Sequence, residues 1–282
     1  MSNRNIVVLG ADGLLASDLI ELLQYDGTAV VRVYSKELCD VTKYKNVYYN
    51  LVGETTHVIN CAALNDIELC EKSPELATAV NDKAVKNLTE VCLDNKIHLT
   101  HFSTAQVYNG NKLEPYLEND PTEPLSVYAK SKLAGDSHVL SMGDKGLVIR
   151  TNWLFGKFRP NLVNTVMSNL EKNIVTELED DEIGNPTYTL DLANTVLSLA
   201  LSNKSGTYNV TNSEQCSKYE LGMKLAEYLE KKDLIKAKKS TNVLMPKFTV
   251  LSNNRLIQTL PETLRPWHSA LYQYLLEVGK VQ

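Results

Sequence analysis

The sequence lacks the features that mark several large classes of protein. Its 282 residues carry a formal net charge of −5 and contain no run of five or six like charges, so we expect no nucleic-acid partner. No segment approaches the roughly 18 consecutive apolar residues of a membrane span, and the apolar run at residues 6–9 is too short for a signal peptide. We therefore expect a cytoplasmic protein with no membrane partner.

Cysteine and histidine are too few and too scattered for a metal site. The five cysteines form no CxxC pair and are odd in number, which indicates reduced, packing thiols in a cytosolic compartment. The five histidines make neither HExxH nor any other metal-binding spacing. The sequence therefore predicts no metal.

A glycine turn near the N-terminus indicates a dinucleotide-binding fold. The β-branched run at residues 5–9 is typical of a buried strand, and it breaks at the sequence GADGLLA before an amphipathic helix that reaches about residue 24. Gly10 permits the tight turn, and Gly13 allows a pyrophosphate to approach the backbone at the positive end of the helix. A mere turn is the alternative interpretation of this short motif.

Strands and helices then alternate, which predicts a doubly wound parallel sheet of the Rossmann type. Strands are expected at residues 30–34, 57–61, 98–103 and 146–150, and helices at 41–51, 74–95 and 126–140. Further helices are expected at 162–172, 191–201, 218–231 and 267–278, and further strands at 174–178 and 207–210. We expect residues 1–152 to form the NAD(P)-binding domain and residues 153–282 mainly a smaller substrate-binding lobe, with some exchange of chain between them.

A tyrosine and a lysine four residues apart form the candidate catalytic pair. Tyr128 and Lys132 share one face of the helix expected at 126–140. A lysine ammonium beside a phenol favours the phenolate, so the pKa of the tyrosine is expected to fall below its usual value of about 10. Such a pair suits carbonyl reduction. A solvated helix face is the alternative, but the preceding dinucleotide turn favours the catalytic interpretation.

Several motifs occur in an order that resembles the extended short-chain dehydrogenase/reductase family, and within it the dTDP-4-dehydrorhamnose reductases. The matching stretches, which cover nearly the whole length, are GADG at 10–13, NCAA at 60–63 with Glu71 and PELA at 74–77, ST at 103–104 with VY at 107–108, YAKSKLAG at 128–135, RTNWLFG at 150–156, GNPT at 184–187 and residues 267–271. Their joint order is far more specific than any one of them.

The resemblance implies a chemistry for these positions. NADPH, with NADH as the alternative, would deliver hydride to the C4 keto group of a nucleotide-linked 4-keto-6-deoxy sugar, most specifically converting dTDP-4-dehydro-L-rhamnose to dTDP-L-rhamnose. Tyr128 would protonate the new alkoxide, Lys132 would hold the nicotinamide ribose, and Thr104 would hydrogen-bond the reacting oxygen. The resemblance also allows a homodimer.

The resemblance further assigns the two binding surfaces. Cofactor-binding positions are Gly10, Asp12, Gly13, Leu14, Leu15, Arg32, Asp40, Val41, Ala62, Ala63, Leu64, Ser103, Tyr128 and Lys132. Substrate-binding positions are Thr104, Gln106, Val107, Trp153, Asn185 and Lys247. Arg32 near the end of the second strand would accept a 2′-phosphate, which favours NADPH. The alternatives are a surface arginine at 32, a core aromatic at 153 and a turn residue at 185.

The sequence departs from the family pattern at two places. The related 4,6-dehydratases carry Asp-Glu after the threonine, and Ala105 and Gln106 supply no acid or base, so dehydration is disfavoured. The reductases usually carry aspartate where Ala105 stands. The family's Arg-Pro before the last strand reads Met245-Pro246-Lys247, and a lysine replaces the arginine only as a point charge.

These departures leave two other functions open. A non-catalytic NADP-binding subunit, similar to the β subunit of methionine adenosyltransferase, would keep the nucleotide fold without turnover. A sugar-nucleotide epimerase would need the same tyrosine and lysine.

Overall fold

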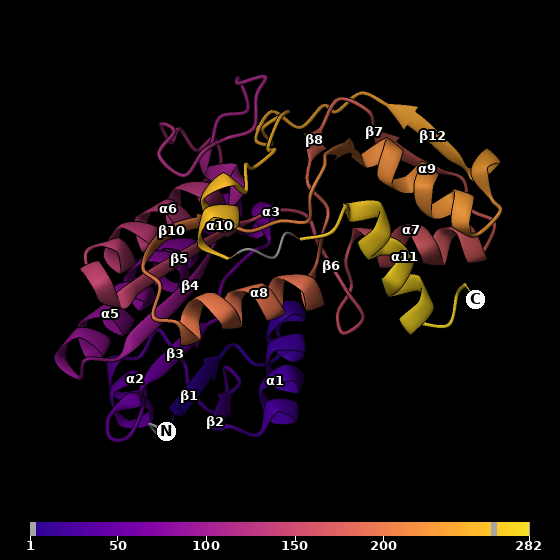
Figure 1. Cartoon of the computed structure of the whole chain (residues 1–282). Coiled ribbons are helices and arrows are strands. Elements are labelled where there is room, and N and C mark those ends of the chain that lie inside the picture. The colour runs from indigo at the N-terminus through magenta and orange to yellow at the C-terminus, as the bar shows by residue number, and fades with distance from the viewer. Residues whose placement is uncertain (1–3, 261–263, 282) are drawn as a thin grey trace.

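A six-stranded parallel sheet forms the core of one half of the molecule (Figure 1). The structure is a computed structural model that describes residues 4–260 and 264–281. The strands lie in the order β10-β5-β4-β3-β1-β2, and every neighbouring pair is parallel. Their bounds are β1 Arg4–Leu9, β2 Ala29–Tyr34, β3 His57–Asn60, β4 His98–Thr104, β5 Gly146–Thr151 and β10 Gly206–Asn209. The predicted Rossmann-type fold is confirmed.

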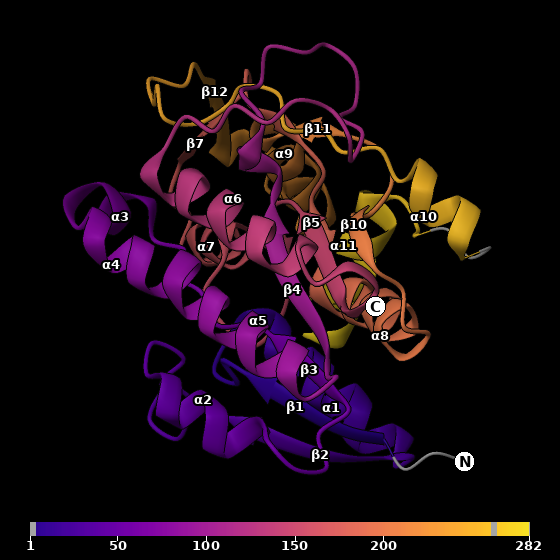
Figure 2. The same ribbon diagram turned by 90° about the vertical axis from the view of Figure 1, so that its left-hand side faces the viewer.

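Helices cover both faces of this sheet because successive strand residues point to opposite sides. Ile6 and Val8 of β1 pack into one apolar core with α1 and α8, whereas Val7 and Leu9 pack into the other with α2, α5 and α6. Figure 2 shows α2, α5 and α6 side by side over the second face. The helices are α1 Leu14–Asp26, α2 Tyr44–Leu51, α5 Ala84–Asp94, α6 Val127–Leu140 and α8 Thr189–Leu201.

The long helix expected at residues 74–95 contains a π-helical turn. The chain forms α4 at Pro74–Thr78, the π turn at Ala79–Lys83 and then α5. Within the turn, Asn81 donates to the Leu64 carbonyl and to Ser131 Oγ on α6. A Cβ at Gly135 would lie 2.3 Å from the Asn81 carbonyl oxygen, so the turn and α6 touch through backbone. The turn thereby fixes the helix that carries Tyr128 and Lys132.

The second part of the chain builds a lobe from short strand pairs and helices. β6 pairs with β9 and β7 with β12 in parallel, and β8 pairs with β11 antiparallel. The elements are β6 Leu154–Phe155, α7 Leu162–Glu171, β7 Thr176–Glu179, β8 Ile183–Gly184, β9 Thr187–Tyr188, β11 Cys216–Ser217, α9 Lys218–Tyr228, β12 Ile235–Lys238, α10 Asn254–Thr259 and α11 Trp267–Glu277. A further short helix, α3 Ile67–Lys72, precedes α4 and was not predicted.

Part of the second half returns to the central sheet. β10 pairs with β5 at the sheet edge, and Leu192 and Val196 of α8 pack in the same core as Ile6 of β1. Leu256 of α10 joins that core as well. The division into two domains at residue 152 stays a proposal, in which β10, α8 and α10 are the segments of the second half that pack on the first. Among the residues that the structure describes, no helix is long and apolar enough to cross a membrane.

Candidate active site

The glycine turn after β1 leaves the start of α1 open to a ligand. Gly10 has a φ of +72°, and a Cβ there would lie 2.6 Å from the Ala62 amide nitrogen, so only glycine fits. Gly13 is the N-cap of α1, no side chain caps the helix, and its first turn has no acidic residue. The N–H groups and the positive end of the helix dipole are therefore free to bind an anion.

A cleft of about 600 Å³ begins at this turn and runs between the sheet and the lobe. It brings together eleven of the predicted residues, namely Asp12, Gly13, Leu14, Leu15, Ala63, Ser103, Thr104, Gln106, Tyr128, Lys132 and Trp153. A second cavity of about 380 Å³ adjoins it and shares Asp12, Gly13 and Ala63. The second cavity holds the predicted residues Gly10, Asp40, Val41, Ala62 and Leu64. The shared residues join the two cavities into one groove.

Local capping sets the position of the catalytic helix. Ser126 is the N-cap of α6 and accepts the Ala129 amide at 3.1 Å, while Glu71 of α3 accepts the Val127 amide at 2.6 Å. Both bonds satisfy N–H groups that a helix start leaves unpaired. Tyr128 and Lys132, one turn apart, are thereby presented to the cleft.

Tyr128 is a neutral phenol in this environment. Burial raises its pKa to about 12, and a hydrogen bond with the Thr104 hydroxyl opposes this shift. This direction is opposite to the one expected from the tyrosine–lysine spacing alone. A phenol with a raised pKa stays protonated at neutral pH and is suited to donate a proton.

Lys132 is almost completely buried. Burial lowers its pKa to about 8, although the Asp136 carboxylate and the Cys61 thiol raise it in part. Its Nζ atom lies 3.1 Å from Nε2 of His101 on β4. The lysine is therefore held against the sheet, in a contact that sequence spacing did not predict.

Trp153 reaches the cleft from a strained backbone position. Its φ is +38°, which is rare for a bulky residue and is typical of functional sites. Asn152 beside it donates to the carbonyl and the hydroxyl of Thr249 at 3.0 and 2.9 Å. A Cβ at Gly184 would lie 2.8 Å from the indole Cε2, so the glycine makes room for the ring.

Four predicted residues lie elsewhere. Arg32 donates to the Asn50 carbonyl at 3.2 Å and to the Thr55 hydroxyl, and it lines neither cavity. Val107 is buried in the core, and Lys247 pairs with Asp181 at 3.1 Å. Asn185 is also buried; it donates to the Glu214 carbonyl and accepts the Leu251 amide, away from the cleft.

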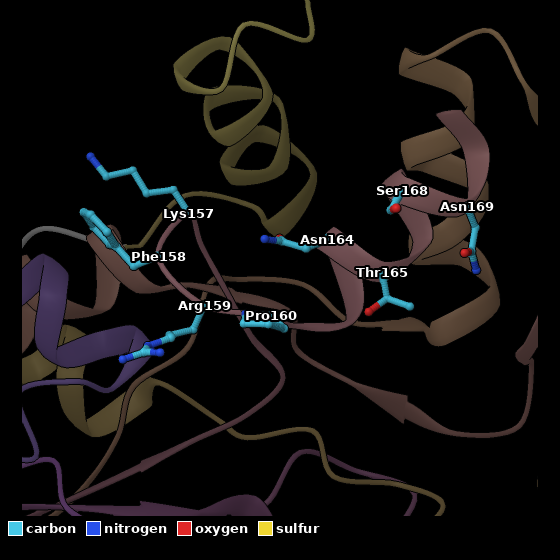
Figure 3. Close-up of a pocket in the computed structure, with 8 residues that line it drawn as sticks. All are labelled: Lys157, Phe158, Arg159, Pro160, Asn164, Thr165, Ser168 and Asn169. Atoms are coloured by element: carbon cyan, nitrogen blue, oxygen red, sulfur yellow. The ribbon is translucent and has the colours of Figure 1, made fainter. Parts of the chain in front are cut away.

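Sequence reasoning missed several residues of the groove. Lys36, in the loop after β2, lines the second cavity where Arg32 was expected. Arg159 lies at the mouth of the cleft and donates to the Asp12 carbonyl at 2.6 Å. Figure 3 shows Arg159 directed toward the N-terminal segment and away from Asn164, Thr165 and Ser168 of α7, which line a neighbouring surface hollow. Lys36 and Arg159 lie in loops, where the sequence has no periodic pattern that would predict their positions.

Known proteins match this chain over almost its whole length. The family model for the RmlD substrate binding domain matches residues 4–279. A dTDP-4-dehydrorhamnose reductase of Streptomyces griseus is 33% identical over 280 residues, which is 94% of this chain and 91% of that protein. A dTDP-4-keto-6-deoxy-D-glucose reductase of Streptomyces niveus is 29% identical, covering 95% of each.

A solved structure agrees with the fold. The dTDP-4-dehydrorhamnose reductase of Bacillus anthracis in complex with NADP superposes with a TM-score of 0.93 at 26% identity, covering 98% of this chain and 99% of that one. The glycine turn, the tyrosine–lysine pair and the groove between them thus occur in a fold shared with these reductases. The chain belongs to the RmlD substrate-binding domain family.

Proposed function

We propose that this protein is an NADPH-dependent reductase that converts the C4 keto group of a dTDP-linked 4-keto-6-deoxy sugar to a hydroxyl, with dTDP-4-dehydro-L-rhamnose as substrate and dTDP-L-rhamnose as product. The observation that supports it best is the meeting of Thr104, Tyr128 and Lys132 in a groove that begins at an uncapped helix N-terminus. The named relatives act on sugars of this kind.

Cofactor fit is supported by the shape and polarity of the groove. The uncapped start of α1 suits the pyrophosphate, and the small side chains of Ala62 and Ala63 leave space beside it. Lys36 places a cation in the second cavity, and we assign the 2′-phosphate contact to it instead of Arg32. When bound, NADPH supplies the hydride.

The side chains around the sugar have separate roles in proton transfer and substrate binding. Tyr128 donates its phenolic proton to the oxygen of the reduced carbonyl, and Thr104 orients that phenol. Lys132 as an ammonium stabilises the phenolate left behind and holds the nicotinamide ribose. Trp153 and Gln106 line the sugar side of the cleft, and Gln106 Oε1 is buried with no hydrogen-bond partner among the described residues, so it can accept from a substrate hydroxyl.

A turnover assay with a matched variant tests this proposal. Purified protein is mixed with NADPH and dTDP-4-dehydro-L-rhamnose, and cofactor oxidation is followed by absorbance. Tyr128→Phe is expected to lower kcat by about 10²–10⁴-fold with NADPH binding retained. Tyr25→Phe, on an exposed side chain, is the control and keeps full activity.

Three outcomes contradict the proposal. Full activity of Tyr128→Phe rejects the proton-donor role. Tight NADPH binding without turnover of the native protein favours the regulatory-subunit alternative, and interconversion of sugar epimers without net oxidation favours the epimerase.

Assembly and compartment are proposed on the same basis. We propose a homodimer, which sedimentation of the purified protein would test. We also propose the cytoplasm, because all five cysteines are free thiols, as a reducing compartment keeps them.

A further inference from the structure

A row of buried polar side chains lies against Lys132 and has no part in the chemistry above. Asn60 at the end of β3 and His101 on β4 are register partners in the sheet, and Asp136 follows Lys132 by one turn of α6. All four side chains are at most 2% exposed. Polar groups buried to this extent need hydrogen-bond partners within the protein.

The direction of the first hydrogen bonds is fixed by the backbone. The Ala62 amide can only donate, and it lies 3.1 Å from Asn60 Oδ1, which therefore accepts. The other end of the same side chain, Nδ2, is then an NH₂ group, and it lies 3.1 Å from His101 Nδ1. Nδ1 must accept this hydrogen bond, so the neutral imidazole carries its own hydrogen on Nε2.

That hydrogen has one partner within hydrogen-bond distance. His101 Nε2 lies 3.1 Å from Lys132 Nζ and 4.0 Å from Asp136 Oδ1, which is too far for a hydrogen bond. An ammonium group has three donors and no lone pair, so one of its N–H groups would face the N–H of the imidazole and no hydrogen bond could form. Only a neutral amine can accept from the imidazole.

We propose that His101 is a positioning residue for Lys132: held by Asn60 in the tautomer with its hydrogen on Nε2, it hydrogen-bonds only the neutral amine and stabilises the uncharged lysine before the cleft is filled. This inference rests on the proposed role of Lys132. Protonation of the lysine breaks the contact and frees the side chain for Tyr128 and the ribose. The neutral lysine is therefore held by the imidazole, and the protonated lysine is not.

The charged groups around the pair are consistent with this arrangement. The Asp136 carboxylate on α6 favours the ammonium form of Lys132. Its Oδ2 atom also lies 3.7 Å from Arg150 of β5 and accepts a hydrogen bond from the Ser103 hydroxyl at 2.6 Å, so the carboxylate does not interact with the lysine alone. The Cys61 thiol after β3 also favours the ammonium, and burial outweighs both in lowering the pKa of Lys132. Burial is the main cause that lowers the pKa of His101 well below its ordinary value, and the charge of a protonated Lys132 lowers it further, so the imidazole stays neutral in both states of the lysine.

The tautomer can be read directly by two-bond ¹H–¹⁵N correlation of the cofactor-free protein, above the pH at which Lys132 loses its proton. We expect a protonated Nε2 and an unprotonated Nδ1 for His101, assigned by loss of its signals in His101→Gln. His98 is an internal reference for the same tautomer, because its Nε2 lies 2.8 Å from the Lys204 carbonyl and has to donate. A hydrogen on Nδ1 of His101 overturns the proposal.

The effect on the lysine is tested by titrating protein labelled with ¹³Cε-lysine. The glutamine of His101→Gln can turn its carbonyl oxygen toward an ammonium, so we expect the Lys132 midpoint to rise by about one pH unit. His98→Gln, a matched change on the same strand, leaves the midpoint unchanged. An unchanged or lower midpoint in folded His101→Gln rejects the proposal. Neither measurement requires turnover, so failure of the proposed reductase activity would show separately in the Tyr128→Phe assay.

Discussion

Replacing Gly184 with alanine is expected to weaken sugar binding through Trp153. Gly184 has no positive φ, so alanine strains no backbone there and only space decides the effect. The new Cβ would lie 2.6 Å from Asn152 Nδ2 and 2.8 Å from the indole Cε2. Asn152 is tied to Thr249 by two hydrogen bonds and cannot move cheaply. The indole ring therefore takes most of the displacement.

The size of the effect follows from these contacts. Carbon atoms in contact lie about 3.5 Å apart, so the ring edge has to move by about 0.7 Å. Trp153 already holds a φ of +38°, which leaves its backbone little freedom to follow. Overpacking of this kind costs about 1–3 kcal/mol. If that energy is lost from sugar binding, KM for the sugar nucleotide rises by roughly 5- to 150-fold.

The assay compares KM for the sugar nucleotide with the Kd for NADPH, because the cofactor end of the groove is untouched. Gly222→Ala is the matched control: its Cβ would lie 2.2 Å from Leu178 in the core of the lobe, so it should lower Tm and leave KM unchanged. A folded Gly184→Ala enzyme with unchanged KM would show that Trp153 does not contact the sugar.

Three further predictions concern the cofactor and pH. Lys36→Ala should raise KM for NADPH by about tenfold and leave KM for NADH unchanged, whereas Arg32→Ala should change neither; the reverse result would return the 2′-phosphate to Arg32. Burial lowers the pKa of Lys132 from 10.5 to about 8, and the reaction uses the ammonium form. We therefore expect kcat/KM to be constant below pH 8 and to fall as the pH rises through about 8. A profile that stays level up to the usual lysine range would contradict this. Gly10→Ala, with φ +72° and a Cβ 2.6 Å from Ala62, should cost about 1–3 kcal/mol in denaturant unfolding and weaken NADPH binding, and unchanged stability would refute the close approach.

The elements of the sheet could be predicted because their signals are local. Buried strands such as β1 are short apolar runs of β-branched residues, and helices such as α6 begin at a capping residue, Ser126. The two-residue strands β6 and β9 could not be predicted, because two residues carry no periodicity. The π turn at Ala79–Lys83 was hidden as well, since Gly135, which it contacts, lies far along the chain.

The candidate site was predicted where the motif itself supplies the geometry. Tyr128 and Lys132 needed only helix spacing, and Gly10 needed only a turn. The raised pKa of Tyr128 could not be predicted from spacing, because burial is a property of the assembled cleft. The strand expected at residues 30–34 agrees with β2, but the sequence did not show that the Arg32 side chain is held by Asn50 and Thr55, or that Lys36 lines the groove.

The return of α8 and β10 to the central sheet constrains how the substrate lobe can change during evolution or engineering. The chain passes into the lobe after β5 and returns to the nucleotide half at α8. It stays there through β10, which pairs with β5, and then enters the lobe again. A shorter protein ending at residue 152 would lack the helix that covers α1 and the strand that closes the sheet beside β5. New sugar specificity is therefore best introduced in loops between these shared elements, because residues after 152 complete the core against which β1 packs.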